Sequence, residues 1–512
     1  MAVAEPGILE RTARGAGWVV AWRMATRVLG LVSTLVLARL LVPEDFGLVA
    51  LATSFAFALD ACFLVGVEDQ IIRARDANRA LYDTAFTMSL IRGVAVGVLV
   101  ALFAPVAAAF FGDERLTSIL LALALALAAS GLTNIGTVDF RRYLNFHLEF
   151  RLMLLPRVAS VLAAIATAML FRSYWALVVG IIVHRGGVIA MSYAMHPYRP
   201  RLSLSAWRDL VGVSFWAWAI GLAVMVRDRS DAVVIGRMSG PAQFGTFAAG
   251  SELATVTTSE MAVAASRAVM PGLADLRRNN TPEAEREALL RIVRLMLLFT
   301  LPFGVGASLI AGPAVVAMLG PRWVEAIPVV AIIALAGTLS PLDTVGVGWL
   351  RAQAALRTLL IVVIGSACLR FGLLLVLTGP FGLWGAAIAV AVSMAAEPVV
   401  TFIIVARRLD IALASVCQAA YRPLIAAACM ATVLAVLGLG WAAPPADAAA
   451  ALRMLALAIP CGVVTYCSVL LALWFAAGMA AGAEADALGA LRRLMDALRR
   501  RRMPRPGMAR PD

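Results

Sequence analysis

The sequence RLLVPEDFG at residues 39–47 recurs as RMSGPAQFG at residues 237–245. Four residues are identical at one fixed spacing of 198 positions: Arg39 and Arg237, Pro43 and Pro241, Phe46 and Phe244, Gly47 and Gly245. Further along the chain the spacing is 208 or 209 for three more identities: Gly112 and Gly320, Arg142 and Arg351, Trp175 and Trp384. Self-similarity at a nearly constant spacing indicates two copies of one structural unit.

The composition places both copies in a membrane. Of the 512 residues, 62% are hydrophobic and 15% are charged, and the mean hydropathy is +0.89. Soluble domains contain about 45–50% apolar residues. Apolar runs of about 20 residues, the length that crosses about 30 Å of hydrocarbon, recur from Trp18 almost to Ala481. The sequence therefore predicts an all-α polytopic membrane protein.

Polar breaks between these runs predict about fourteen transmembrane helices. They begin near residues 16, 47, 84, 116, 152, 174, 209, 243, 289, 325, 358, 382, 422 and 451. The repeat then predicts two six-helix halves related by a pseudo-twofold axis along the membrane normal, because six is even and both copies enter from the same side. The predicted domains are 1–205 with a short N-terminal interfacial segment, 206–410, helices 13 and 14 at 411–481, and a basic cytoplasmic tail at 482–512.

Arginines gather in every second gap between the apolar runs. The positive-inside rule therefore predicts an even number of spans with both termini in the cytoplasm. The gaps on the other side are short and carry few charges, so no outside domain is expected. The arginine-bearing gaps contain Arg73, Arg75 and Arg79; Arg141, Arg142 and Arg151; Arg199, Arg201 and Arg208; Arg277, Arg278 and Arg286; Arg351 and Arg357; and Arg407 and Arg408.

Several kinds of chemistry are excluded by what the sequence lacks. It contains no lysine, which a phosphate-binding P-loop requires. The six cysteines and the three histidines, His147, His184 and His196, show no metal-ligand spacing. The net charge of +13 comes from gaps beside apolar runs, which favours membrane lipids over nucleic acid as partners. We expect no cofactor and no bound metal.

Five stretches carry a resemblance to a known family. The sequence resembles the Wzx-type polysaccharide flippases of the multidrug/oligosaccharidyl-lipid/polysaccharide superfamily, from about residue 15 to 410. The similar stretches are LARLLVPEDFG at 37–47, RPRLSL at 199–204, VIGRMSGPAQFG at 234–245, MLGPRWVEAIP at 318–328 and GPFGLWGA at 379–386.

The resemblance implies a flippase in the bacterial inner membrane. Such a protein moves undecaprenyl-diphosphate-linked oligosaccharide units from the cytoplasmic to the outer leaflet for exopolysaccharide, capsule or O-antigen assembly. Polysaccharide polymerase and chain-length machinery are the partners that it implies. None of the five stretches identifies the sugar.

Two arginines lie within the first predicted helix, Arg23 and Arg27. Their i, i+4 spacing puts them on one face, where like charges repel, and each costs about 2.5–3.5 kcal/mol on insertion scales. We expect this face to line a wet cavity that binds a diphosphate or an acidic sugar. The alternative is a shorter helix with Arg23 at the interface and Arg27 paired with an acid.

The seventh predicted helix carries Arg227, Asp228, Arg229 and Asp231 near its middle. Successive helical residues point about 100° apart, so the four side chains cannot share one face. Two interpretations remain open. Arg227 and Arg229 bind substrate, or the group forms a structural salt-bridge network, in which Arg227 and Asp231 neutralise each other at i, i+4.

Acidic residues in apolar runs are candidates for coupling to a proton or a sodium ion. These are Asp60, Asp231, Glu252, Glu260, Asp343 and Glu397. Asp60 and Glu252 rank first because the repeat puts them on equivalent helices, the second and the eighth. The alternative for each is an ion pair with a nearby arginine. In the hypothesis as a whole, an arginine-lined cavity attracts the anionic headgroup while the lipid tail stays in the bilayer and the halves rock around it.

Other classes of membrane protein are alternatives to this hypothesis. A membrane enzyme such as a polysaccharide polymerase needs a reactive group of side chains near one leaflet, and the sequence shows no paired carboxylates or metal motif. We therefore predict no enzyme. A flippase for the peptidoglycan precursor lipid II or a cation-coupled multidrug exporter shares the superfamily fold, and both stay open as alternatives.

Overall fold

The fold is known from a computed structural model, which describes residues 8–63, 67–74, 78–210, 215–279 and 282–478. These residues form helices and connecting loops, with no strand among them. Nine of their helices are long and apolar enough to cross a membrane, or ten if one pair bent by 72° counts as a single span. The all-α polytopic prediction is thus confirmed. The count of fourteen and the division into two six-helix halves stay predictions.

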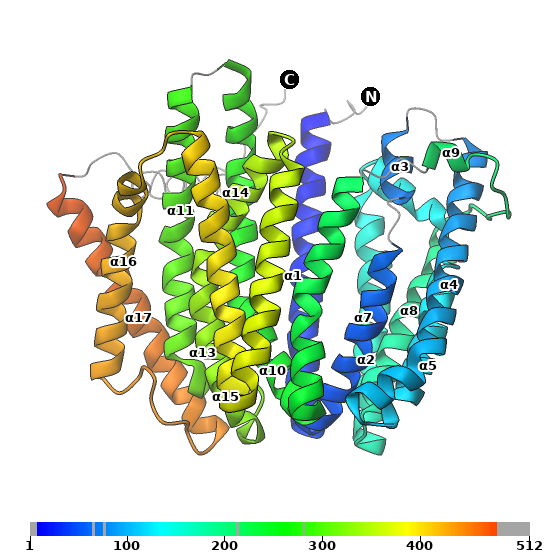
Figure 1. Cartoon of the computed structure of the whole chain (residues 1–512), viewed down its shortest axis with the longest axis horizontal. Helices are drawn as coiled ribbons and strands as arrows, with labels where there is room; N and C mark the ends of the chain where they lie inside the picture. Colours follow the sequence, from blue (N-terminus) through cyan, green and yellow to red (C-terminus); the bar gives the residue numbers. More distant parts are fainter. Residues whose placement is uncertain (1–7, 64–66, 75–77, 211–214, 280–281, 479–512) are drawn as a thin grey trace, which may run out of the picture. The chain divides into compact units, whose positions relative to one another are not determined.

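The first part of the chain contains both short and long helices (Figure 1). They are α1 (Ile8–Leu40), α2 (Pro43–Cys62), α3 (Val67–Arg73), α4 (Arg79–Phe111), α5 (Arg115–Ser130), η1 (Ile135–Val138), α6 (Asp139–Arg142), α7 (Phe146–Phe171), α8 (Trp175–Met195) and α9 (Trp207–Leu210).

The second part begins with the longest helical run. Its elements are α10 (Phe215–Asn279), α11 (Pro282–Leu309), α12 (Ala311–Met318), η2 (Pro321–Ala326), α13 (Ile327–Ala336), η3 (Gly337–Leu339), α14 (Ser340–Ala352), α15 (Leu356–Arg408), α16 (Leu413–Val436) and α17 (Ala448–Ala476). The basic tail predicted at 482–512 lies outside the described residues.

Two glycines interrupt the longest helices. Gly240 in α10 has φ 82° and Gly382 in α15 has φ 55°, a backbone region that glycine enters without steric cost. An unbroken α15 would be about 80 Å long at 1.5 Å per residue, far more than the hydrocarbon thickness. The break leaves two lengths of about 39 Å, at 356–381 and 383–408, each long enough to cross a bilayer.

The chain divides into two compact units. The first comprises residues 1–251, 315–329 and 356–390, and the second the remainder. In the first unit α4 packs on α5, α7 on α8, and α1 along α7. Buried side chains from α1, the residue after it, α7 and α8 form one apolar cluster there, made of Leu37, Leu41, Ala164, Ala168 and Ala176. The predicted boundaries at 205 and 410 stay predictions.

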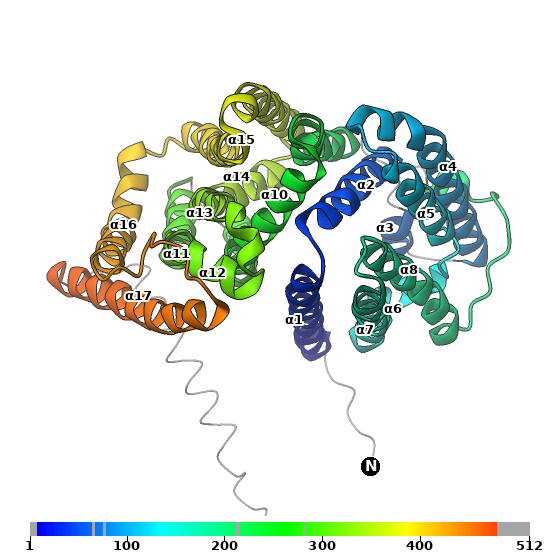
Figure 2. The same ribbon diagram turned by 90° about the horizontal axis from the view of Figure 1, so that it is seen from below.

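The second unit is built around α11. Figure 2 shows α16 and α17 beside it, and both helices contact it. The buried Tyr466 hydroxyl of α17 donates to the carbonyl oxygen of Leu298 at 2.8 Å, and the Thr300 hydroxyl donates to that of Thr338 at 3.2 Å. These bonds satisfy polar groups that apolar surroundings would otherwise leave unpaired.

The outward surfaces of both units are apolar. Leu102 of α4 is 67% exposed and Val436 of α16 is 80% exposed, and many other large apolar side chains are similarly uncovered. Soluble proteins rarely expose contiguous apolar surface on this scale. The described helices therefore form a multi-pass membrane protein.

Candidate functional site

A group of charged side chains joins α10 to α15 within the first unit. The Arg370 guanidinium is buried, with Nη2 3.1 Å from Asp231 Oδ2 and Nη1 4.0 Å from Asp228 Oδ1. Arg227 Nε donates to Asp228 Oδ1 at 2.9 Å. We call Arg227, Asp228, Arg229, Asp231 and Arg370 the charge cluster. Its three cations and two anions leave one positive charge in excess.

The charge cluster also reaches α2. Arg229 Nη1 lies 3.4 Å from the hydroxyl oxygen of Ser54, which is buried on α2. Asp231 Oδ1 accepts the backbone N–H of Ala232 at 2.8 Å. Removing one partner of a buried ion pair leaves the other charge uncompensated, so these side chains are held together as a set.

Arg370 is a member of the charge cluster that the sequence patterns do not predict. The salt-bridge interpretation of the group at 227–231 named Arg227 as the partner of Asp231, and the structure adds a partner on another helix, 139 positions along the chain. The available signal was a single arginine inside the apolar run from Leu359 to Leu377. A lone charge in such a run is costly, which marks the residue but does not identify its partner.

The two arginines of the first helix lie on α1, as predicted. Arg23 is exposed and Arg27 is half-buried, both in the candidate span Ala21–Leu40. Their cavity-lining role stays a prediction.

The acidic candidates lie in different surroundings. Asp60 of α2 accepts a hydrogen bond from Arg92 Nη1 of α4 at 2.8 Å, so it has the arginine partner that sequence analysis gave as the alternative. Glu252 is exposed, and the side chain of Glu260 lies outside the described residues. Ion coupling by these residues stays a prediction. The described part of the chain contains no group of three histidine, cysteine or acidic residues that could hold a metal ion.

The two copies of the repeated sequence face each other in the first unit. A methyl group added at Gly47 would overlap the carbonyl oxygen of Pro241, and one added at Gly245 would overlap that of Pro43. Gly245 is the counterpart of Gly47, and Pro43 is the counterpart of Pro241, so the two contacts are the same contact made once by each copy. Such reciprocity is the property of a twofold contact. We call residues 39–47 and 237–245 the repeat junction.

A third motif packs on the repeat junction. Trp323 is fully buried and its Nε1 donates to the carbonyl oxygen of Ala38 at 3.0 Å. The rings of Trp323 and Phe46 meet edge to face with centroids 5.2 Å apart. Arg39 Nη2 donates to the carbonyl oxygen of Ala317 at 2.9 Å. Three of the five stretches that carry the family resemblance thus meet at one place.

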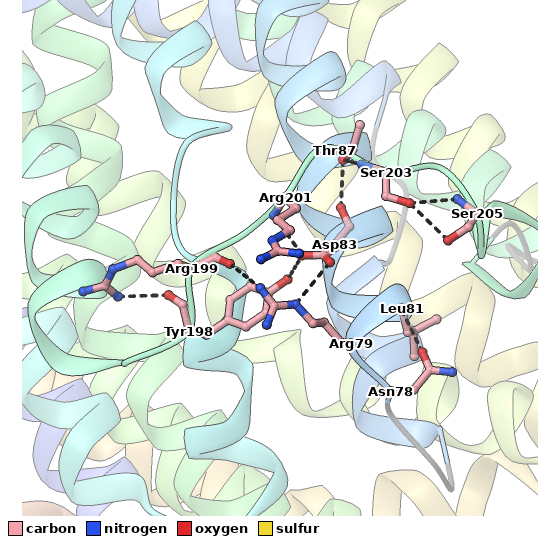
Figure 3. Close-up of polar contacts among 10 residues, drawn as sticks. All are labelled: Asn78, Arg79, Leu81, Asp83, Thr87, Tyr198, Arg199, Arg201, Ser203 and Ser205. Carbon is pink, nitrogen blue, oxygen red and sulfur yellow. Dashed lines mark hydrogen bonds and ion pairs between the residues drawn. The ribbon is translucent and has the colours of Figure 1, made fainter.

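A fourth motif, RPRLSL at 199–204, is bound by α4 (Figure 3). Asp83 accepts the Tyr198 hydroxyl, and it also accepts the backbone N–H of Arg201 at 2.8 Å. Thr87 Oγ1 accepts the backbone N–H of Ser203 at 2.9 Å. Thr84 Oγ1 accepts that of Ala206 at 3.1 Å. We call Asp83, Thr84 and Thr87 with residues 198–206 the linker clamp, because it fixes the segment between α8 and α9.

A second tyrosine–carboxylate pair supports the linker clamp. The Tyr82 hydroxyl donates to Asp139, and the rings of Tyr82 and Tyr198 lie with centroids 5.6 Å apart. His196 Nε2 is 3.5 Å from Asp139 Oδ2. Burial lowers the pKa of His196 and the positive Arg199 lowers it further, while Asp139 acts in the opposite direction. Burial and the bond to Asp83 raise the pKa of Tyr198, so it remains a hydrogen-bond donor.

The second unit contains an apolar cavity of about 310 Å³ between α11, α16 and α17. Its lining includes Phe303, Ile310, Met430, Leu434, Ile459 and Val463. Almost all of this lining is carbon, so the cavity suits a hydrocarbon chain. No sequence pattern predicts a role for these helices.

Comparison with known proteins identifies relatives over most of the chain. A family model described as polysaccharide biosynthesis protein matches residues 36–328, more than half of the sequence. The succinoglycan biosynthesis transport protein ExoT of Rhizobium meliloti is 24% identical over 65% of this chain and 67% of its own. The lipopolysaccharide biosynthesis protein WzxC of Escherichia coli is 21% identical over 64% and 68%. The teichuronic acid biosynthesis protein TuaB of Bacillus subtilis is 21% identical over 65% and 70%.

Solved structures share the fold. The lipid II flippase MurJ in an inward closed conformation superposes with a TM-score of 0.69 at 14% identity, over 89% of this chain and 99% of its own. An inward-facing multidrug resistance transporter of the MATE family, in the MOP superfamily, superposes with a TM-score of 0.58 at 16% identity, over 75% and 94%. At such identities the likeness concerns the fold alone.

Proposed function

This chain belongs to the polysaccharide biosynthesis protein family, and from that premise we propose that it flips undecaprenyl-diphosphate-linked oligosaccharide units across the bacterial inner membrane. The units would serve exopolysaccharide, capsule or O-antigen assembly. The chain is a membrane transporter, not an enzyme. The relatives named above, which concern succinoglycan transport and lipopolysaccharide and teichuronic acid biosynthesis, support a saccharide substrate.

The charge cluster is the observation that carries this proposal. The proposed substrate has a diphosphate between a sugar and a long apolar tail. Charged side chains in a membrane helix cost about 2.5–3.5 kcal/mol each at its centre, and they mark solute pathways for that reason. An excess of arginine in the cluster suits an anionic headgroup, since guanidinium groups bind phosphate in a bidentate manner. Arg23 and Arg27 would add to the same attraction.

The apolar cavity of the second unit supports a lipid-linked substrate. Its carbon lining, between α11, α16 and α17, gives a prenyl chain apolar contacts. Helices α16 and α17 make up much of the segment 411–481, which follows the two predicted halves. We propose that this cavity accommodates a lipid chain.

The repeat junction supports transport by alternating access. In the proposed orientation, with both termini in the cytoplasm, the junction lies at the outer side and closes it while substrate enters from inside. Gly47 and Gly245 allow the close backbone contact, which separates when the protein opens outward. A proton or a sodium ion entering at Asp60, Asp231, Glu252 or Glu260 would couple this change to an ion gradient.

Cells with the gene deleted test this proposal. The lipid-linked oligosaccharides of deleted, complemented and parental cells are compared, with an impermeant sugar-modifying reagent reporting the leaflet. The proposal predicts that a complete unit accumulates on the inner leaflet of deleted cells and returns to normal on complementation. A complete unit that reaches the outer leaflet without the gene would contradict it. Accumulation of the peptidoglycan precursor instead would identify the lipid II alternative.

A further inference from the structure

Arg370 is a buried cation with unused hydrogen-bond donors. Only 8% of the residue is exposed, and its helix is long and apolar enough to cross a membrane. A guanidinium has five N–H donors. Among the described residues, Asp231 accepts one hydrogen bond from it at 3.1 Å, and Nε has no acceptor. Buried polar groups are nearly always hydrogen-bonded, and among the described residues the Nε of Arg370 has no acceptor, so this N–H is free to bind a further anion.

The two carboxylates beside Arg370 differ in how firmly they hold it. Asp231 forms a hydrogen bond, and its side chain is 18% exposed. The oxygen of Asp228 stays 4.0 Å away, beyond hydrogen-bond distance, and its side chain is 48% exposed. Asp228 is also bonded to Arg227 at 2.9 Å. Asp231 therefore orients the guanidinium, whereas Asp228 can be replaced by another anion.

We propose that Arg370 binds a phosphate group of the substrate, which takes the place of Asp228 while Asp231 holds the guanidinium in position. A phosphate oxygen pair accepts two parallel N–H bonds from a guanidinium, and the donors that lack protein acceptors supply them. Asp231 is a positioning residue in this arrangement and Arg370 a binding residue. The proposal rests on the flippase function proposed above, and it specifies the diphosphate as the recognised group.

The test uses the full-length chain purified in lipid nanodiscs. Three probes are titrated by calorimetry: inorganic pyrophosphate, farnesyl diphosphate and the neutral farnesol. Four proteins are compared with the parent: Asp228→Asn, the double variant Arg370→Gln with Asp231→Asn, the triple variant that combines all three changes, and Arg185→Gln as control. The double variant removes both charges of the buried pair, so no uncompensated charge remains. Arg185 is a half-buried arginine of α8 that stacks on Phe57.

The affinity for farnesyl diphosphate should shift in opposite directions in Asp228→Asn and in the double variant. Asp228→Asn removes the competing anion and should tighten farnesyl diphosphate binding about threefold or more. The double variant should weaken it about tenfold or more, the effect of losing a charge-assisted hydrogen bond. The triple variant should bind as weakly as the double one, and Arg185→Gln like the parent. If the charges only form a structural ion pair, Asp228→Asn should not tighten the binding of farnesyl diphosphate.

Other outcomes overturn the proposal at distinct points. Unchanged binding in the double variant, an equal loss in Arg185→Gln, or tightening by Asp228→Asn that persists in the triple variant would each remove Arg370 from the site. Equal affinity for pyrophosphate and farnesyl diphosphate would leave the phosphate site but contradict the lipid-linked substrate of the proposed function. Farnesol binding as tightly as farnesyl diphosphate would overturn recognition of the phosphate.

Discussion

The repeat junction and the charge cluster lie in the same unit and are built in opposite ways. The junction consists of short continuous stretches, 39–47 and 237–245, whose backbones touch because glycine leaves no side chain between them. The charge cluster joins Asp231 to Arg370 through side chains alone, 139 positions apart. A backbone contact has one geometry and tolerates no added atom, whereas a side-chain ion pair can exchange one anion for another. In the function proposed above, the repeat junction is therefore the surface that closes and the charge cluster is the part that exchanges partners with substrate.

The largest effect that this comparison predicts comes from a methyl group at the junction. Gly47→Ala places a carbon against the carbonyl oxygen of Pro241, and overpacking of this kind costs about 1–3 kcal/mol. We expect transport of the lipid-linked unit to fall about tenfold or more in complemented deletion cells. Gly372→Ala on α15 is the matched control, since its methyl group would meet nothing within 4 Å. Equal transport by the two variants would break the account of the junction.

The charge cluster should respond less than the junction and in a different manner. Arg229→Gln removes one cation and its contact to Ser54 but leaves Arg370 with Asp231. We expect about a fivefold loss of transport, in keeping with about 1 kcal/mol for a hydrogen bond, measured as the rate at low substrate. Arg229→Lys, which keeps the charge, should recover at least half of the loss. Failure of lysine to recover any transport would mean that the residue only supports packing.

The linker clamp offers a third contrast, because it binds a motif by side chains. Asp83→Ala removes the acceptor for the Tyr198 hydroxyl and the Arg201 N–H, at about 1–3 kcal/mol for groups left unpaired. We expect trypsin to cleave after Arg201 at least about fivefold faster. Asp113→Ala, which removes a partner of Arg115 away from the clamp, is the control. Equal cleavage rates in the two variants would show that Asp83 does not hold the segment.

The smallest predicted effect is a pH dependence at His196. Burial lowers the pKa of this side chain in the folded protein, so the unfolded chain takes up the proton first as the pH falls. Stability from this group is therefore full above its ordinary pKa of about 6.5 and declines as the pH falls through the lower value of the folded state. Asp139 and Arg199 are the charged groups that face it. The measurement is the thermal midpoint at about pH 7.5 and at about pH 5.5, on either side of that ordinary pKa. The midpoint should drop more between these two pH values in the parent than in His196→Gln.

Sequence patterns predict the membrane fold because the length of each apolar run is enough to identify a helix that can cross a bilayer. They also predicted that Gly47 and Gly245 are equivalent, since both follow the same Pro-x-x-Phe pattern. That the two copies touch each other could not be deduced, because a repeat fixes equivalence and not contact. Trp323 was part of a motif, but its bond to Ala38 depends on how distant helices pack.

The charged residues were harder to interpret from sequence. The group at 227–231 was recognised as costly, and Asp60 as a residue in need of a partner, yet Arg370 and Arg92 were not assigned to them. Both partners lie on other helices and at unrelated spacings. An ion pair between helices depends on which helices are neighbours. The periodicity of one helix shows the face on which a residue lies but not the helix that packs against it.

The most direct test of the central claim is reconstitution. The purified chain is placed in vesicles together with the lipid-linked oligosaccharide extracted from deletion cells, and an impermeant sugar-modifying reagent is added outside. We predict that the fraction of modified lipid rises from about half, the outer-leaflet share, toward the total in vesicles with the parent protein, rises about tenfold or more slowly with Gly47→Ala, and stays near half in protein-free vesicles. A fraction that stays near half with the parent protein, with and without an imposed proton or sodium gradient, would contradict the account.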